Sequence, residues 1–379
     1  MKLFRLQDVE KEQREQMLDL PFLLLTLVIT GIGLVMIYSS SFARAQFETG
    51  DSAYYFKRQL VFSLVGIAVM LALSRVRPEL IRRLAFPVLG VSILLLALVF
   101  VPGIGQSENG AARWIRLGIS FQPSEIAKLG VVLSYAAMIA AFQEKMTTFR
   151  WGIAPFGAIL LVIVILLRLE PHNSAIVIIA CTAGAMLFLG GVQYRWFLLG
   201  GAVMLLGLLA ILGAGGYEAS RITAWRDPFS DPTDNGYQIL QSLYAIGSGG
   251  LLGLGFGQGR QKYLYLPEEH NDYIFAIVCE ELGLVGALVI LSLYALLILR
   301  GYWIAMHAKD RFTGLVVAGI VTLTALQVFF NIGVVTNLLP STGISLPFFS
   351  YGGTALLIQL SEMGLVLGAS RTCGLGYLS

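Results

Sequence analysis

Long apolar runs with almost no charge recur along the chain and constrain its fold more than any other feature. Hydrophobic residues make up 56% of the 379 positions and charged residues only 13%. A helix needs about 20 apolar residues to cross the hydrocarbon core of a bilayer. In lipid only helices and closed barrels satisfy their backbone polar groups, and these runs lack the alternating pattern of barrel strands. The sequence therefore predicts an all-α, polytopic membrane protein.

About ten transmembrane helices are expected, with boundaries loose by several residues. Their predicted ranges are 21–42, 58–74, 84–102, 124–142, 152–168, 173–191, 196–214, 272–299, 312–335 and 351–369. Lys and Arg beside a span are retained on the cytoplasmic side. The cations that crowd alternate short loops are Arg75, Arg77, Arg82, Arg83, Lys145, Arg150, Arg300, Lys309 and Arg311. This pattern places both termini in the cytoplasm, with residues 1–20 and 371–379 flanking a single transmembrane domain of residues 21–370.

One connection is far longer than the others. Residues 215–271 form a large extracellular loop between the seventh and eighth predicted spans, and connections of such length usually have a function. Within it, residues 237–259 are moderately apolar and rich in glycine, which favours a re-entrant or interfacial helix. The alternative is an eleventh span, which would put the termini on opposite sides and Asp272 in the cytoplasm.

A first polar cluster lies in the second external loop and the span after it. Arg113, Trp114 and Arg116 precede Glu125 and Lys128. The last two are three residues apart, so they share one helix face. Because ionisable groups inside a membrane are usually functional, we expect Lys128, oriented by Glu125, to face an anionic substrate. The alternative is an interfacial salt bridge that only fixes the helix.

A second cluster lies in the large loop, up to the start of the eighth span. Its members are Arg221, Arg226, Asp227, Asp231, Arg260, Lys262, His270 and Asp272. Guanidinium groups bind phosphate oxygens in a bidentate way, so the arginines suit a pyrophosphate. Ordinary juxtamembrane charge is the alternative.

Carboxylates also occur inside predicted spans. Glu280 and Glu281 lie within the eighth span, and Glu362 within the last. Glu280 follows Asp272 by eight residues, about 80° of net rotation on a helix, so we expect the two to share a groove.

Two prolines, Pro340 and Pro347, interrupt the helical pattern within residues 331–353. The small residues around them let the backbone bend and pack closely. This segment contains no obvious acid, base or nucleophile, and we expect a structural re-entrant turn.

Cysteines and histidines are few. Cys181, Cys279 and Cys373 form no disulfide framework, and neither they nor the three histidines have metal-ligand spacing. Basic stretches interleaved with aromatic residues, which would indicate nucleic acid, are missing from the sequence.

Three separated motifs resemble a known family. They are QPSEIAKL at residues 122–129, PEEHNDYIFAIVCEELG at residues 267–283 and PSTGISLPFFSYGG at residues 340–353. In this order they are similar to the SEDS family (RodA, FtsW and SpoVE), and the last motif is closer to FtsW and SpoVE. The resemblance implies a peptidoglycan glycosyltransferase that polymerises lipid II at the outer face of the bacterial cytoplasmic membrane. It also implies a class B penicillin-binding protein as partner.

The resemblance implies site residues as well. The matching positions are Asp272, on the family's candidate catalytic aspartate, then Glu125, Lys128, Arg113 and Trp114. Two positions depart from the family. His172 stands where many members have an aspartate, and Asn271 stands where Thr or Ser is usual.

The chemistry implied is a single inverting displacement, because an α-linked sugar pyrophosphate becomes a β-linked glycan. One general base takes the proton from the attacking 4-hydroxyl of GlcNAc, and we assign this role to Asp272. Cations rather than a general acid are expected to stabilise the pyrophosphate as it leaves. The expected substrate contacts are Lys128, Arg221, Arg226, His270 and Glu280. A divalent cation, Mg²⁺ or Mn²⁺, could assist, although no ligand motif supports it.

Two other classes of function stay open. A flippase for the lipid-linked precursor would have Glu125, Lys128 and Glu280 along its path. The sequence shows no obvious internal repeat, and its densest titratable cluster sits at one surface, which tells against this class. A scaffold that recruits the penicillin-binding protein would not need Asp272.

Overall fold

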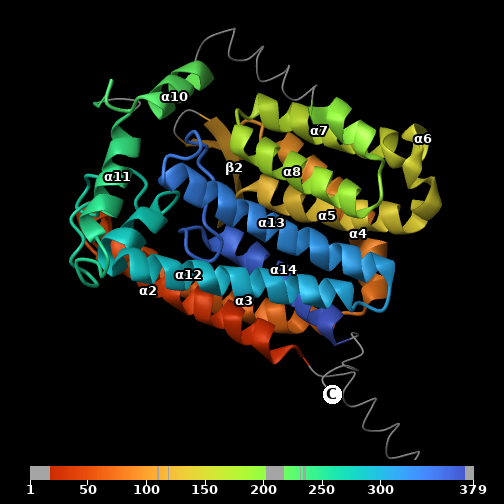
Figure 1. Ribbon diagram of the computed structural model, residues 1–379, viewed down its shortest axis with the longest axis horizontal. Helices are drawn as coiled ribbons and strands as arrows, with labels where there is room; N and C mark the ends of the chain where they lie inside the picture. Colours follow the sequence, from red (N-terminus) through yellow and green to blue (C-terminus); the bar gives the residue numbers. More distant parts are fainter. Residues whose placement is uncertain are drawn as a thin grey trace, which may run out of the picture.

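Helices dominate the computed structural model, which describes residues 18–371 except residues 109–110, 118, 202–216, 231 and 234–235. The helices are α2 (Leu20–Thr49), α3 (Tyr54–Leu73), α4 (Pro78–Leu98), α5 (Pro123–Phe142), η1 (Gln143–Thr147), α6 (Phe149–Gly152), α7 (Ala154–Leu169), α8 (Asn173–Leu189), α10 (Tyr217–Arg226), α11 (Tyr237–Gly249), α12 (Ile274–Met306), α13 (Arg311–Val335) and α14 (Gly353–Ser370). The long helices run side by side as one bundle (Figure 1).

Eight helical segments are long and apolar enough to cross a membrane. They coincide with eight of the ten predicted spans. The sixth predicted span is α8, an apolar helix of 17 residues, and the seventh, 196–214, lies mostly outside the described residues. The prediction of an all-α polytopic membrane protein is confirmed. Almost all of the predicted cytoplasmic segments, residues 1–20 and 371–379, also lies outside the described part of the chain.

The centre of the bundle is formed by α5 and α13. Inside the structure, 78% of the spanning stretch that contains α5 and 72% of that in α13 are buried, against 22% in α3 and in α4. α5 packs on α4 and α8, and α13 packs on α12, α5 and α8. The outer helices therefore offer most of their surface to lipid, and polar groups on α5 are shielded from it.

The loops that carry the predicted site meet at one end of the bundle, which we call the loop end. It includes the connections of residues 99–122, 217–273 and 336–352, and it lies at the left in Figure 1, where α10 and α11 are. α2 continues past its predicted end at residue 42 to Thr49, until Gly50 takes a left-handed conformation with φ 73°. This extension brings Arg44 to the large loop.

α12 is broken near its beginning. Gly283 has φ 67° and ψ −169°, which is not helical. The glycine-rich stretch after α11 pairs with the broken backbone. Leu254 and Gly255 donate to the carbonyls of Glu280 and Glu281 at 2.9 and 3.1 Å, and Leu284 donates to the carbonyl of Gly250 at 2.9 Å. Backbone groups freed at membrane depth must be satisfied by protein, and this loop satisfies them.

The close packing of this stretch against α12 accounts for its glycines, and its helix is too short to cross the membrane. A side chain at Gly253 would meet the carbonyl oxygen of Glu281 at 2.1 Å, so only glycine fits. α11 has 13 residues, which at 1.5 Å per residue is about 20 Å, shorter than the hydrocarbon core. The structure therefore favours the re-entrant prediction over an eleventh span.

A three-stranded antiparallel sheet covers part of the loop end. Its strands are β1 (Gly105–Glu108), β2 (Ala111–Leu117) and β3 (Ile119–Phe121), and Ile115 pairs with both Gly105 and Phe121. Sequence analysis predicted only a loop here. Ile115 is fully buried, and because alternate residues of a strand point to opposite faces, Trp114 and Arg116 take the other face. The register of β2 against β1 shifts at Arg113.

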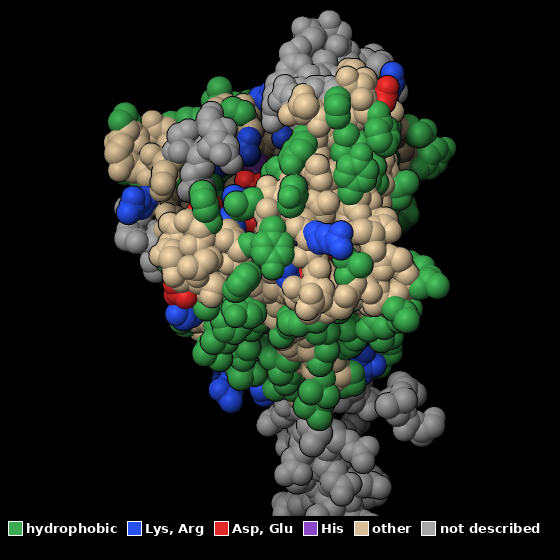
Figure 2. Space-filling view, turned by 90° about the vertical axis from the view of Figure 1, so that its left-hand side faces the viewer, with side chains coloured by type: hydrophobic (Ala, Val, Ile, Leu, Met, Phe, Trp, Pro, Cys, Tyr) green, Lys and Arg blue, Asp and Glu red, His purple; other side chains and the backbone are tan. Residues whose placement is uncertain are grey.

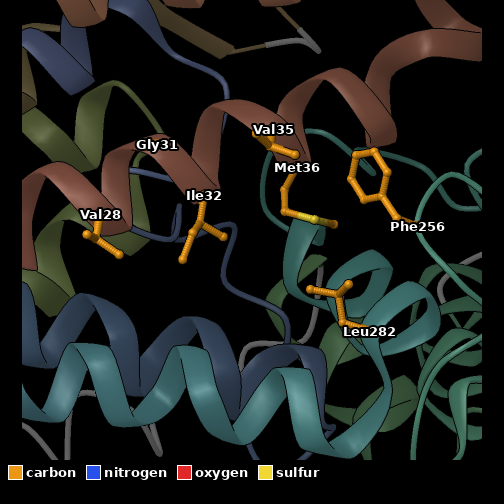
Figure 3. Close-up of a pocket in the computed structure, with 7 residues that line it drawn as sticks. All are labelled: Val28, Gly31, Ile32, Val35, Met36, Phe256 and Leu282. Atoms are coloured by element: carbon orange, nitrogen blue, oxygen red, sulfur yellow. The ribbon is translucent and has the colours of Figure 1, made fainter.

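An apolar groove of about 420 Å³ lies between α2 and the break in α12 (Figure 3). Its lining residues are Val28, Gly31, Ile32, Val35, Met36, Phe256 and Leu282. Because these side chains carry no polar or titratable group, the groove cannot supply acid, base or anion-binding chemistry. The candidate site must lie among the charged residues of the loop end.

Candidate active site

Asp272 lies in the turn that leads into α12, two residues before its first helical residue. Burial raises the pKa of this carboxyl, and Glu268 raises it further, while Arg221, His270 and Arg113 lower it, with a result of about 6. These five side chains come from the large loop, α10 and β2, so the fold brings distant charges together. Figure 2, which faces the loop end, shows acidic, basic and histidine side chains gathered in the upper part of this face.

The turn is fixed by an ion pair from α2. Arg44 donates through Nε and Nη2 to the two carboxylate oxygens of Glu269 at 2.7 and 2.8 Å. Burial by itself would raise the pKa of Glu269, but the nearby His270, whose Nδ1 lies 3.7 Å from Glu269 Oε1, and the hydrogen bonds from Arg44 outweigh it and hold that pKa below its usual range. This bidentate pair is the strong form of a charged hydrogen bond, and it anchors the turn to the bundle.

His270 packs between aromatic rings rather than facing open solvent. Its ring centroid lies 4.7 Å from that of Tyr55 and 5.7 Å from that of Tyr351. Its carbonyl accepts a hydrogen bond from the amide of Tyr351 at 2.8 Å. We therefore infer that His270 shapes the turn as well as contributing to the electrostatics at Asp272.

Two arginines from different elements interact electrostatically with Asp272. Arg113 of β2 donates to the carbonyl of Pro171, and Arg221 of α10 donates to the carbonyl of Ser341 at 3.0 Å. Both influence the Asp272 carboxyl electrostatically. The prediction that residues far apart in the sequence supply cations to one place thus has a structural basis for these two.

Other predicted contacts lie farther out. Arg226 is exposed at the end of α10, and Trp114 is half-buried on β2. Asp231 lies outside the described residues.

Glu125 and Lys128 form a buried ion pair on α5. Lys128 Nζ lies 2.7 Å from Glu125 Oε2, and the two residues are 6% and 7% exposed. Glu362 of α14 is close enough to interact electrostatically with both charges. Burying an ion pair is costly, and ionisable groups inside a membrane are usually functional, so the burial favours a functional role over a merely interfacial salt bridge.

His172 links that pair to the Asp272 region. Burial lowers the pKa of His172 to about 3, and Arg113 and Lys128 lower it as well. Its Nε2 lies 3.3 Å from Nε2 of Gln122. The imidazole is therefore neutral at physiological pH, where the family pattern would provide a carboxylate, and it adds no negative charge between Arg113 and Lys128.

Glu280 and Glu281 hold the glycine-rich loop against α12. Glu280 accepts from the amides of Arg260 at 2.8 Å and Gln261 at 3.2 Å. Glu281 accepts from Lys262 Nζ at 2.7 Å, from the hydroxyl of Ser39 and from the amide of Gly257. Their oxygens are thus occupied by protein donors, which is typical of structural carboxylates.

The expected groove shared by Asp272 and Glu280 is a wrong prediction. Asp272 precedes α12, so the helical rotation used to place it does not apply. The Glu280 carboxylate is directed to residues 260–261, and Lys262, expected as a surface charge, is buried.

Sequence analysis missed the contribution of residues 331–352. Asn331 of α13 donates to the carbonyls of Asp272 and Ile344, both at 2.7 Å, and a side chain at Gly343 would come within 3.0 Å of Asp272 Oδ2. The available signal was an asparagine inside an apolar run, followed by a proline-bounded segment of small residues. Within the described ranges, no group of three His, Cys, Asp or Glu is placed to hold a metal ion.

Comparisons with known proteins agree with this arrangement. The family model for FtsW, RodA and SpoVE, described as cell cycle protein, matches residues 19–373. Stage V sporulation protein E of Bacillus subtilis (strain 168) is 39% identical over 354 residues, which cover 93% of this chain and 97% of the relative. A probable peptidoglycan glycosyltransferase FtsW of Geobacter metallireducens is 41% identical, covering 93% of this chain and 94% of the relative. A solved chain from a peptidoglycan synthase complex that coordinates polymerization and crosslinking has a TM-score of 0.79 at 28% identity, covering 93% of this chain and 98% of that chain.

Proposed function

Because this chain belongs to the FtsW, RodA and SpoVE family of cell cycle proteins, we propose that it is a peptidoglycan glycosyltransferase that polymerises lipid II into β-1,4-linked glycan. The proposal draws on relatives that carry this activity in their names. The observation that carries it is the Asp272 carboxyl, whose pKa of about 6 lies close to neutral pH, beside Arg113 and Arg221. A general base is most effective when its pKa lies near the working pH.

Asp272 acts as the general base of an inverting displacement. It accepts the proton of the 4-hydroxyl of the acceptor GlcNAc while that oxygen attacks the anomeric carbon of the donor. The bond between this carbon and the pyrophosphate oxygen breaks, and its electron pair leaves with the pyrophosphate. The carboxylate must be ionised to accept the proton, which holds above pH 6.

Cations stabilise the pyrophosphate as it leaves. Arg113 and Arg221 lie at Asp272, and Arg226 is exposed near them on α10. Lys128, which is paired with Glu125 on α5 inside the bundle, gives a further positive charge for the pyrophosphate of the donor. Preorganised cations directed at developing charge are an effective means of catalysis. A divalent cation, Mg²⁺ or Mn²⁺, would act through the pyrophosphate oxygens that bind it.

The loop end faces the outside of the bacterial cytoplasmic membrane in this proposal, and both termini lie in the cytoplasm. The cations at the opposite end of the helices, such as Arg77, Arg83 and Arg311, support this orientation. We expect a class B penicillin-binding protein as partner, because the solved relative comes from a complex of polymerization and crosslinking.

A lipid II flippase is the second candidate. The buried ionisable side chains of Glu125, Lys128 and Glu362 within the bundle favour it. The structural role of Glu280 removes one residue from the path that this function would use.

Polymerisation of labelled lipid II by the purified full chain, with and without a class B partner, tests the proposal. Wild type should produce long glycan strands, and Asp272→Asn, which keeps the size but not the base, should produce none. Asp51→Asn is the matched control, because Asp51 is an exposed loop-end carboxylate that pairs with Lys57. Equal activity of wild type and Asp272→Asn would refute the role of Asp272. Lipid II transport into liposomes without glycan would favour the flippase.

A further inference from the structure

Residues 336–352, between α13 and α14, form a wall beside Asp272. Arg221 donates to the carbonyl of Ser341 at 3.0 Å, and the Tyr273 hydroxyl lies 3.4 Å from the Ser341 hydroxyl. Gly343 has φ 69°, and a methyl group there would come within 3.0 Å of Asp272 Oδ2. The wall therefore passes close to the carboxylate, and the space around that carboxylate depends on how wall and turn are held together.

The turn is held through three consecutive carbonyls, two of them bound by the wall and one by α13. The carbonyl of His270 accepts from the amide of Tyr351 at 2.8 Å, and that of Asn271 accepts from the Ser350 hydroxyl at 2.8 Å. The carbonyl of Asp272 accepts from Asn331 Nδ2 at 2.7 Å. The backbone of the turn is thus fixed residue by residue.

Asn331 differs from the other two donors because it holds both parts at once. Its amide nitrogen carries two hydrogens, and it donates one to the carbonyl of Asp272 and the other to that of Ile344, each at 2.7 Å. Asn331 is 1% exposed on α13, a central helix of the bundle. Its side chain therefore anchors both the turn and the wall to the core of the bundle.

We propose that Asn331 is a positioning residue for Asp272, setting the distance between its carboxylate and the wall at Gly343. The effect of Asn331 on catalysis rests on the proposed function, whereas its hydrogen bonds to the turn and the wall do not depend on that function. A buried carbonyl that loses its donor is costly. Without Asn331 the carbonyls of Asp272 and Ile344 lose the donor that ties both to α13, so the turn at Asp272 and the wall near Gly343 shift relative to each other, although Ser350 and Tyr351 still hold the preceding residues. Misplacement of a catalytic group by 1 Å can lower a rate about 100-fold.

Asn331→Leu is the test variant, since leucine has a similar branched shape and no donor. Thr324→Val on the same helix is the matched control, because the Thr324 hydroxyl is buried and bonds only to the carbonyl of Ile320 in its own helix. In the lipid II assay, Asn331→Leu should lower kcat about 100-fold with KM within about twofold, and Thr324→Val should have little effect.

The pH profile separates positioning from a loss of folded protein. Charged groups facing Asp272 are Glu268, Arg221, His270 and Arg113. With these unchanged, solvation of a loosened Asp272 moves the acid limb of the kcat profile to lower pH by about half a unit or more. A lower kcat with an unchanged limb, in proportion to the folded fraction, would show a merely structural role and overturn the inference.

Hydrogen exchange of residues 268–275 gives a readout without turnover. Asn331→Leu should exchange there at least tenfold faster than wild type and Thr324→Val, and equal exchange would overturn the inference even if no glycan is made. If Asn331→Leu does not fold, Asn331→Ala, which is smaller and also has no donor, takes its place with the same expectations. Failure of wild type to polymerise lipid II would count against the proposed function alone.

Discussion

The buried ion pair between Lys262 and Glu281 gives a sharp test of how the glycine-rich loop is held. The side chains are 3% and 0% exposed, and Lys262 Nζ lies 2.7 Å from Glu281 Oε1. Glu281 also accepts from the hydroxyl of Ser39 and the amide of Gly257. Lys262→Met removes the only full positive charge that the structure places on this carboxylate within the described residues.

The expected cost follows from the loss of one partner of a buried pair, about 3–5 kcal/mol. Since about 1.4 kcal/mol corresponds to a factor of ten, opening of the loop becomes about 100- to 4,000-fold more frequent. The double variant Lys262→Met with Glu281→Gln leaves no unpaired charge and keeps an acceptor for Gly257. It should be much closer to wild type than the single variant is.

Hydrogen exchange of the full chain, read on peptides that cover residues 250–266, measures this opening. Lys57→Met is the control, because Lys57 and Asp51 form an exposed pair at the same end, with side chains 65% and 44% exposed. Exposed pairs contribute little, so exchange around Asp51 should not change measurably. Exchange of residues 250–266 within tenfold of wild type in Lys262→Met, or a double variant as labile as the single, would refute the reasoning.

Two further predictions concern the surroundings of Asp272. Charged groups facing its carboxyl are Glu268, Arg221, His270 and Arg113. The rate of polymerisation should fall as pH drops through about 6, where the base becomes protonated. Glu268→Gln should move this acid limb to lower pH, because it removes a charge that raises the pKa of Asp272. A wild-type pH–rate profile with its acid limb near 4 would contradict this. Gly343→Ala should abolish most activity, whereas Gly103→Ala should not: both have a positive φ, but only Gly343 faces Asp272 Oδ2 while Gly103 faces open space. Glycan yield from the two folded variants decides between them.

Hydropathy predicted the bundle because the requirement for apolar residues in lipid is local. Each spanning segment must satisfy its own backbone and bury its own surface, so eight helices could be placed from single runs of sequence. The resemblance to FtsW and SpoVE is confirmed by the family model, which matches residues 19–373, and by relatives of both kinds. Relatives of these two kinds are about 40% identical to this chain.

The partners of the buried carboxylates could not be predicted, because they depend on tertiary contacts. Glu280 and Glu125 both appear in sequence as acids within a span, yet one holds loop amides and the other a lysine on its own helix. Only the second has its partner within one helical turn, where spacing can reveal it. The strands at residues 105–121 were missed because short external connections were expected to be irregular.

The break at Gly283 divides α12 into two parts with different surroundings. All residues of Ile274–Glu281 are buried, whereas Leu284, Val285, Leu288 and Val289 are each about half exposed. The short part packs within the protein next to the Asp272 turn, and the long part has a surface that can contact lipid. A neighbouring helix that displaced the long part would act first on the break at Gly283 and on the loop that bonds to it, before the turn. The two parts of α12 are thus joined through the glycine-rich loop, which bonds to residues on both sides of the break.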